Sequence, residues 1–206
     1  MIYFIGGPPR VGKSIIARAI TMKHGISAVS TDSLGAVLET VLDPEAEPGL
    51  FTISRFNEMA EADRIRLMAR NTTRRIDYQI EESVAVWRAV KPFVLREQDE
   101  GRDLVAEGVA VLPELVAQLE GVGYRVVFVG NKGHKQQENI KRSAKENGHD
   151  WMRHASDEYI DAFAAFVVAM SSYIEKEAHR YGFEYVEMDR KPFNDAAAEV
   201  MALLLR

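Results

Sequence analysis

The phosphate-loop pattern at residues 7–14 is the feature of this sequence that most constrains its fold. The segment reads Gly-Pro-Pro-Arg-Val-Gly-Lys-Ser, which is a glycine, four residues and then Gly-Lys-Ser. An apolar run at residues 2–5 precedes it, and a helical pattern at residues 15–22 follows it. The sequence therefore predicts a strand, a phosphate-binding turn and a helix in succession.

Each part of this loop has a physical task in holding a nucleotide. Gly7 and Gly12 permit backbone conformations and a close approach that side chains would block. The loop N–H groups and the helix N-terminus converge on phosphate oxygens, Lys13 neutralises the β- and γ-phosphates, and the Ser14 hydroxyl ligates Mg²⁺. We therefore expect ATP and Mg²⁺ as cofactors. The predicted nucleotide-binding residues are Gly7, Pro8, Pro9, Arg10, Val11, Gly12, Lys13, Ser14 and Ile15.

The rest of the chain alternates short apolar runs with helical periodicity, which is typical of a parallel sheet covered by helices. The expected strands are residues 2–5, 26–31, 103–107, 125–129 and 183–188. About 70 residues separate the second strand from the third, and about 50 separate the fourth from the fifth. We therefore expect one domain over residues 1–206, with an acceptor-binding helical insertion at residues 33–100 and a lid at residues 131–153. Pro92 should bend or end the helix that contains it near Lys91.

Composition and charge exclude several classes of function. The 206 residues include 26 basic and 31 acidic ones, and this net charge of −5 argues against a general nucleic-acid binder. The absence of cysteine excludes thiol catalysis and cysteine-ligated metals. The longest uncharged apolar stretch, residues 162–173, is shorter than the roughly 20 residues of a membrane span, and the N-terminus has no basic leader. We expect a cytoplasmic protein that acts on a small molecule, without a membrane partner, and we leave a homodimer open.

Two segments are locally basic although the chain is acidic. Residues 54–75 hold six arginines against three acids, and residues 131–153 hold six basic residues against three acids, so each segment carries +3 and the remainder −11. Basic patches on an acidic body suit the capture of a small anion. The alternative is that exposed helix faces simply collect arginines, which pair with acids at helical spacing.

A phosphate loop is shared by GTPases, mechanical ATPases and kinases, and the sequence separates these classes. Residues 130–133 read Gly-Asn-Lys-Gly, but His134 stands where a GTPase has the aspartate that reads guanine. The strand at residues 103–107 ends in one acid, Glu107, and not in the pair of acids that is usual in mechanical ATPases, which also need a longer chain. A small-molecule kinase remains.

Three segments resemble the nucleoside-monophosphate-kinase-like P-loop kinases, especially the 2-phosphoglycerate kinase and chloramphenicol phosphotransferase type. They are residues 6–14, residues 29–33 (Val-Ser-Thr-Asp-Ser) and residues 104–113 (Leu-Val-Ala-Glu-Gly-Val-Ala-Val-Leu-Pro). The resemblance implies an α/β P-loop fold whose five-stranded parallel sheet has the order 2-3-1-4-5, with helices on both faces. It also implies ATP–Mg²⁺-dependent phosphoryl transfer to a small, anionic metabolite or nucleotide.

Two acidic residues end predicted strands, at the sheet edge where α/β proteins bind ligands. Such kinases use an aspartate at the position of Asp32 to accept the proton of the substrate hydroxyl or to hold Mg²⁺. The alternative for Asp32 is a helix N-cap. Glu107 and Gly108 are expected to bind substrate, and Glu107 also to hold Mg²⁺. The alternative for Glu107 is a strand-end acid that faces solvent. The predicted metal set is Ser14, Asp32 and Glu107.

The basic patches supply the remaining site residues. In the lid, Arg142 is expected to neutralise charge on the transferred phosphoryl group, with Lys145 as the alternative. The lid segment has no R-x-x-x-R pattern of the family's lids. In the first insertion, Arg55, Arg70 and Arg74, clustered with Arg75, are expected to bind an anionic acceptor. A rival function is a nucleotide-binding regulatory protein in which ATP orders the lid for a partner and no transfer occurs.

Overall fold

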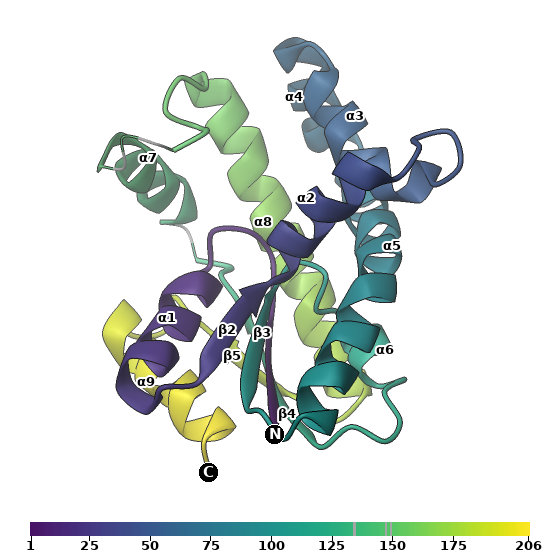
Figure 1. The fold of residues 1–206 in the computed structure, drawn as a ribbon. Coiled ribbons are helices and arrows are strands. Elements are labelled where there is room, and N and C mark those ends of the chain that lie inside the picture. The colour runs from purple at the N-terminus through teal and green to yellow at the C-terminus, as the bar shows by residue number, and fades with distance from the viewer. Residues whose placement is uncertain (134, 147, 149) are drawn as a thin grey trace.

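The computed structural model describes residues 1–133, 135–146, 148 and 150–206, and a parallel sheet forms its centre (Figure 1). The strand order is β2-β3-β1-β4-β5, and every pair of neighbouring strands is parallel. This confirms the sheet order and fold class expected from the sequence. The strands are β1 (Ile2–Gly6), β2 (Ser27–Ser30), β3 (Leu104–Gly108), β4 (Tyr124–Gly130) and β5 (Glu184–Glu187).

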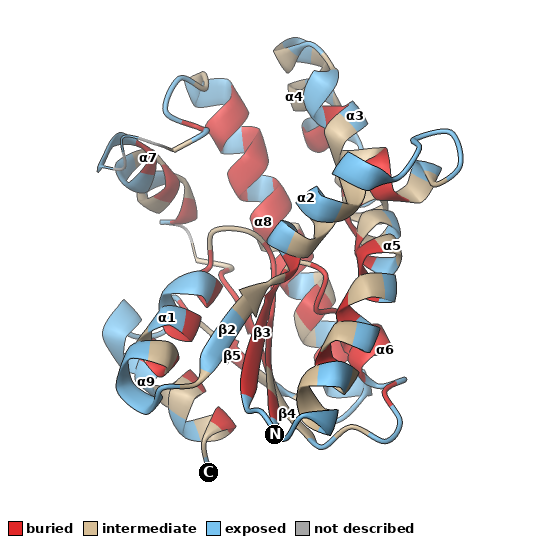
Figure 2. Cartoon of the chain, in the orientation of Figure 1, coloured by how far each residue is buried: buried red, intermediate tan, exposed pale blue. Residues whose placement is uncertain are grey.

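Helices cover both faces of the sheet. Helices α1 (Lys13–His24) and α9 (Phe193–Leu204) lie on one face, and α5 (Thr72–Asp99), α6 (Pro113–Val116) and α8 (Asp157–Arg180) lie on the other (Figure 1). The inner strands β1 and β3 are almost entirely buried, whereas the edge strand β2 is partly exposed (Figure 2). The central strands therefore consist of apolar residues without alternation, as a sheet buried on both faces requires.

The two long inter-strand segments contain the extra helices. Between β2 and β3 lie α2 (Thr31–Val41), the 3₁₀ turn η1 (Pro48–Phe51), α3 (Thr52–Glu58), α4 (Glu61–Arg70) and α5. Between β4 and β5 lie α7 (Gln136–Glu146) and α8. Helices α2, α3, α4 and α7 rise beyond the carboxyl ends of the strands, on either side of a central gap (Figure 1). His134, Asn147 and His149 of the predicted lid lie outside the described residues.

Helix α5 corrects one expectation, because it continues for seven residues beyond Pro92. Proline lacks an N–H group, so the carbonyl of Arg88 loses its partner four residues later. Both Pro92 and Arg88 are exposed, which lets water bond to that carbonyl, while Val90 and Val94 anchor the helix in the core. The expected end of the helix near Lys91 is therefore wrong, and the alternative of a bend there stays a prediction.

Within the described residues no helix combines the length and apolarity that a membrane crossing would need.

Candidate active site

The phosphate loop connects β1 to α1 in a conformation that its glycines make accessible. Gly7 has φ +153° and Gly12, which precedes the first residue of α1, has φ +98°. A Cβ atom on Gly7 would collide with the carbonyl oxygen of Val129 on the neighbouring strand β4. Arg10 also has a positive φ, +63°, which is uncommon for a residue with a side chain. The loop is thus held in a tight turn at the carboxyl end of the sheet.

Lys13 is buried at the first position of α1, with 6% of its surface exposed. Its Nζ donates a hydrogen bond of 2.7 Å to the carbonyl oxygen of Pro8, across the turn. Burial lowers the pKa of Lys13, whereas the charges of Asp32 and Glu107 oppose that shift. Lys13 is therefore a cation enclosed by the loop and flanked by two carboxylates.

Ser14 and Glu107 form a pair beside this lysine. The Oγ of Ser14 donates to Oε1 of Glu107 at 2.9 Å, and Glu107 is 5% exposed at the end of β3. Burial raises the pKa of Glu107, and Lys13 and the bond from Ser14 lower it in part. Glu107 therefore does not face solvent as a free strand-end acid.

The residues beside the phosphate loop suit only one way of holding a divalent cation. Among the described residues no group of three His, Cys, Asp or Glu side chains could hold a metal ion alone. Mg²⁺ in kinases is usually held by one or two side chains together with substrate phosphates. The hydroxyl of Ser14 and the carboxylate of Glu107, beside the phosphate loop, fit that mode of binding. The described residues do not fit a site in which protein side chains alone hold the ion.

Asp32 lies in the first turn of α2, and a different residue caps that helix. The side chain of Ser30 accepts a hydrogen bond of 3.2 Å from the backbone N–H of Asp32. Ser30 is therefore the N-cap, and the capping alternative for Asp32 is wrong. The Asp32 side chain is exposed and lines a pocket next to the loop.

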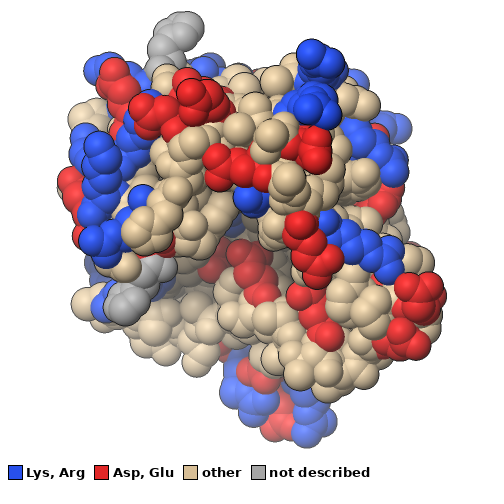
Figure 3. Space-filling view, turned by 90° about the horizontal axis from the view of Figure 1, so that it is seen from above, with Lys and Arg blue, Asp and Glu red and all other residues tan. Residues whose placement is uncertain are grey.

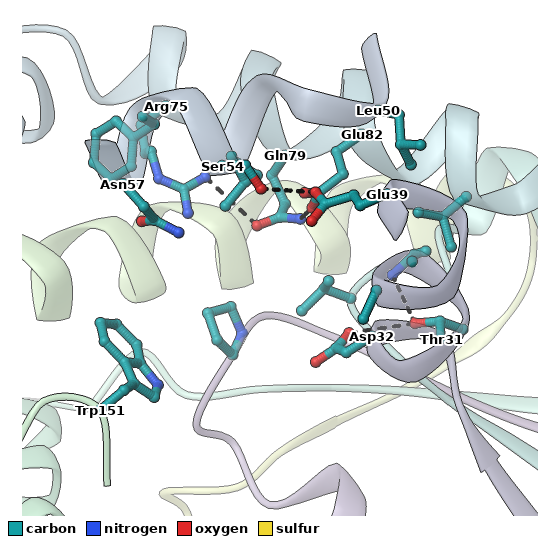
Figure 4. Close-up of a pocket in the computed structure, with 18 of the residues that line it drawn as sticks. Thr31, Asp32, Glu39, Leu50, Ser54, Asn57, Arg75, Gln79, Glu82 and Trp151 are labelled. Carbon is teal, nitrogen blue, oxygen red and sulfur yellow. Dashed lines mark hydrogen bonds between the residues drawn. The ribbon is translucent and has the colours of Figure 1, made fainter. Parts of the chain in front are cut away.

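Among the described residues, three pockets include residues of the phosphate loop, and one of them lies against Ser14, α1 and β2. The other two lie at the ends of the strands and concern the ligands. One, of about 740 Å³, is lined by Arg10 to Ile15 of the loop and by residues of α7 and of the β5–α9 connection. We call it the nucleotide-side pocket. The other, of about 360 Å³, is lined by Pro9 and Asp32 and by residues of α2, α3, α5 and α8 (Figure 4). We call it the acceptor-side pocket. Gly108 lies outside both linings, and its backbone, at φ +146°, packs closely against Thr31.

The side chain of Arg10 connects the phosphate loop to the predicted lid segment, residues 131–153. Its Nη1 donates a 3.0 Å hydrogen bond to Ser143 Oγ, and its Nη2 pairs with the carboxylate of Asp150. The guanidinium carbon also lies 5.4 Å from the ring centre of Trp151, which lines the acceptor-side pocket. Sequence reasoning predicted a phosphate contact for Arg10 and missed these partners, which are more than 130 positions away.

The two candidate lid cations lie differently. Arg142, on α7, lines the nucleotide-side pocket and donates a 3.0 Å hydrogen bond to Asn139 Oδ1. Lys145 is exposed and is absent from that lining. Geometry therefore favours Arg142, whose role stays a prediction.

Of the four arginines of the first insertion that the sequence analysis singled out, one reaches the acceptor-side pocket and three do not. Arg55 donates to the carbonyl oxygen of Pro44 at 3.0 Å, and Arg74 lies over the ring of Tyr78 at 4.5 Å. Arg55, Arg70 and Arg74 are exposed and line neither pocket. Arg75 lines the acceptor-side pocket and is buried. The substrate-binding roles of the other three stay predictions.

Viewed onto the carboxyl ends of the strands, the molecule is hollowed at its centre (Figure 3). Acidic side chains are visible in and around this hollow, and lysines and arginines gather on the surrounding surface. In the acceptor-side lining the carboxylates are Asp32, Glu39 and Glu82. The described lining of the acceptor-side pocket therefore holds more acidic than basic side chains.

Comparisons with known proteins agree with this geometry. No family model matches the chain. A 2-phosphoglycerate kinase of Pyrococcus horikoshii is 34% identical over 123 residues, which are 59% of this chain and 38% of that protein. The 2-phosphoglycerate kinase of Pyrococcus furiosus is 26% identical over 189 residues, 91% of this chain and 59% of that protein. The chain thus spans about four-tenths to six-tenths of these relatives' length. The expected resemblance to 2-phosphoglycerate kinases is confirmed.

Solved structures with the same fold include two kinases. A shikimate kinase from Acinetobacter baumannii, crystallised with shikimate, has a TM-score of 0.51 at 13% identity and covers 99% of this chain and 92% of its own. A sugar kinase from Janibacter sp. HTCC2649 has a TM-score of 0.50 at 13% identity, with 98% and 92% covered. At this identity the likeness establishes the P-loop kinase fold.

Proposed function

We propose that this protein is an ATP- and Mg²⁺-dependent kinase that transfers a phosphoryl group to a hydroxyl of a small molecule. The observation that carries the proposal is the position of the phosphate loop between two pockets. Arg10 to Ile15 line the nucleotide-side pocket, and Pro9 lines the acceptor-side pocket. A switch protein needs a nucleotide site only, whereas a transferase needs a second site within reach of the terminal phosphate.

On the donor side, the loop N–H groups, Lys13 and Ser14 would hold the phosphates of ATP. Lys13 is the enclosed cation, and its flanking carboxylates Asp32 and Glu107 favour its charged form. Ser14 and Glu107 would hold Mg²⁺, directly or through water. The ion would neutralise phosphate charge and orient the terminal phosphoryl group.

On the acceptor side, Asp32 would receive the proton of the attacking hydroxyl. Its carboxylate lines the acceptor-side pocket and is close enough to Lys13 to influence the pKa of that lysine. A base must lie within reach of the proton it removes, and this position satisfies that need for a hydroxyl directed at the loop. Arg142 would stabilise the charge that develops on the transferred group.

The names of the relatives supply one acceptor to test. Two proteins similar to this chain are named 2-phosphoglycerate kinase. Their likeness supports small-molecule kinase activity, and 2-phosphoglycerate is therefore a first compound for assay. The acceptor of this chain is a separate question, because the relatives are longer and 26–34% identical.

The test is ATP-dependent transfer to a panel of small hydroxylated acceptors, detected by phosphorus NMR. We expect a phosphorylated product from the wild-type protein. Lys13→Ala should lower transfer by at least about 100-fold, the scale on which preorganised electrostatic groups act. Lys23→Ala, an exposed lysine at the end of the same helix, is the matched control. ATP binding without acceptor-stimulated turnover would instead support the regulatory function.

A further inference from the structure

We infer that the acceptor is a polyhydroxylated acid with one carboxylate and no phosphate, and that Arg75 binds this carboxylate. The inference rests on the proposed kinase function and specifies its substrate class. It departs from the substrate in the relatives' name, since 2-phosphoglycerate carries a phosphate as well as a carboxylate. Among the described residues that line the acceptor-side pocket, one is a cation, Arg75.

Arg75 is a built anion site. It lies on α5 with 4% of its surface exposed, and its guanidinium carbon is 4.8 Å from the ring centre of Phe56 and 4.3 Å from that of Phe166. Within the described residues, the hydrogen bond recorded for this guanidinium is a long one, 3.5 Å, from Nη1 to Gln79 Oε1. Nε is buried without a partner.

An arginine in this state is costly unless something binds to it. A buried charge is normally paired, and a buried donor without an acceptor loses the hydrogen bonds that it made in water. Burial lowers the pKa of Arg75 to about 10, which still leaves the side chain charged at neutral pH. A planar guanidinium binds a carboxylate through two parallel hydrogen bonds, so an acid in the pocket would satisfy it.

The remaining charges of the pocket oppose a second anionic group. Among the described lining residues Arg75 is the only cation. The acidic side chains are Asp32, Glu39 and Glu82, and burial raises the pKa of Glu82 to about 8, so Asp32 and Glu39 carry the negative charge of the lining at neutral pH. A phosphorylated acid brings about three negative charges at neutral pH. One of these could pair with Arg75, and the others would face carboxylates in a partly enclosed space, where like charges repel strongly. One carboxylate on the ligand matches the one cation.

The hydrogen-bonding groups of the lining favour a ligand rich in hydroxyl groups. Carboxylates accept hydrogen bonds from hydroxyls, and Ser54, Asn57 and Gln79 add polar partners in the same pocket. Trp151 lies opposite Arg75 across the space (Figure 4). A carbon chain that bears hydroxyls on one side and C–H groups on the other fits between them.

The arrangement also orients such a ligand. Arg75 and Asp32 lie at opposite ends of the pocket, with the polar side chains of α3 and α5 between them (Figure 4). A carboxylate on Arg75 would leave a distant hydroxyl of the same molecule at Asp32, next to the phosphate loop. A carboxylate at one end and the reacting hydroxyl at the other is the order that a sugar acid provides.

Two matched series of compounds test the inference. One is glycerate, glycerol and 2-phosphoglycerate, and the other is gluconate, sorbitol and 6-phosphogluconate. Calorimetric binding and ATP-dependent turnover are measured for each compound with the wild type, Arg75→Met, Arg75→Lys and Arg88→Met. The last is the control, because Arg88 is an exposed arginine of the same helix that lies outside the pocket and has no predicted role in the site.

We expect the wild type to prefer at least one unphosphorylated acid over its alcohol and its phosphate by about 10- to 100-fold, the scale of a charge-assisted hydrogen bond. Arg75→Met should remove the preference over the alcohol and leave the KM for ATP unchanged. Arg75→Lys should retain part of the preference, which guards against a folding defect, and Arg88→Met should retain all of it.

The outcomes separate the inference from the proposed function. Transfer to a phosphorylated acid or to the neutral alcohol in preference to the acid would overturn the inference while supporting kinase activity. An acid preference that survives in Arg75→Met would also overturn it. Arg75-dependent binding of an acid without any phosphoryl transfer would support the inference and contradict the kinase function.

Discussion

Ser14 Oγ and Glu107 Oε1 are joined by a hydrogen bond of 2.9 Å, although 93 positions separate the two residues in the chain. Strand pairing brings them together, since Gly6, at the end of β1, lies opposite Gly108 of the neighbouring strand β3. The phosphate loop and its supporting carboxylate are therefore set by the sheet. Of the three predicted metal ligands, these two meet directly.

The first prediction concerns Glu107→Gln. The amide keeps the size of the side chain and can accept the bond from Ser14, but it carries no charge to attract a cation. We expect the Mg²⁺ concentration for half-maximal turnover to rise at least about 10-fold, the scale of a lost supporting ligand. Glu120→Gln, at an exposed acid, should leave the Mg²⁺ titration unchanged. An unchanged Mg²⁺ requirement in Glu107→Gln would make Glu107 a structural partner of Ser14 only.

The second prediction separates chemistry from stability at the start of α2. Asp32→Asn should lower turnover by roughly 100-fold or more, because a positioned base is lost. Its stability should fall by less than about 1 kcal/mol, since Ser30 caps the helix and only the charge in the first turn is removed. Ser30→Ala, the control for stability, should cost about 1 kcal/mol. Turnover and urea unfolding of both variants provide the measurement, and an active Asp32→Asn protein would exclude Asp32 as the base.

The third prediction assigns the lid cation. Arg142→Ala should lower kcat by about 10- to 100-fold and change ATP affinity much less, because the guanidinium acts on charge that develops during transfer. Lys145→Ala, on the same helix but outside the pocket lining, is the matched control. Steady-state kinetics with calorimetry of ATP binding measures both effects. Equal losses of kcat and ATP affinity would make Arg142 an ordinary nucleotide-binding residue, and a loss confined to Lys145→Ala would transfer the role.

Much of the fold could be predicted because its signals are local. The phosphate loop is contiguous, and the buried strands are continuous apolar runs, so both can be read without knowing what packs against them. The sheet order came from the family resemblance, and the comparisons bear it out. The expected end of α5 near Pro92 was wrong because Val90 and Val94 pack in the core and hold the helix beyond a residue that would locally favour its end.

The acceptor-side pocket could not be predicted in the same way. Arg74 and Arg75 are neighbours of the same type, and nothing in their spacing distinguishes them. Arg75 becomes the buried one because Phe56 of α3 and Phe166 of α8 enclose it, and the second of these comes 91 positions later in the chain. The contacts of Arg10 with Ser143 and Asp150 were missed for the same reason, since these residues are distant in the chain. The possible homodimer stays a prediction.

The last prediction concerns Glu82, whose carboxyl lies in the acceptor-side pocket and accepts a 3.0 Å hydrogen bond from Gln79 Nε2. Burial raises the pKa of Glu82 to about 8, and the charges of Glu39 and Asp32 add to that shift, whereas the hydrogen bond from Gln79 and the charge of Arg75 oppose it. In the unfolded chain its pKa is the ordinary 4.5. Between these two values the folded protein holds a proton that the unfolded chain has released.

The sign of the pH dependence follows from this difference. The contribution of Glu82 to stability is fully present below about pH 4.5 and is lost as the pH rises to about 8, at up to about 1.4 kcal/mol per pH unit. Glu82→Gln cannot ionise, so its free energy of unfolding should exceed that of the wild type by an amount that grows from pH 5 to pH 8 and is constant above. Urea unfolding at pH 5, 6.5, 8 and 9 measures the difference. Glu81→Gln, at the exposed neighbouring acid, should show no such growth, and parallel curves for Glu82→Gln and the wild type would show that Glu82 ionises normally in the folded protein.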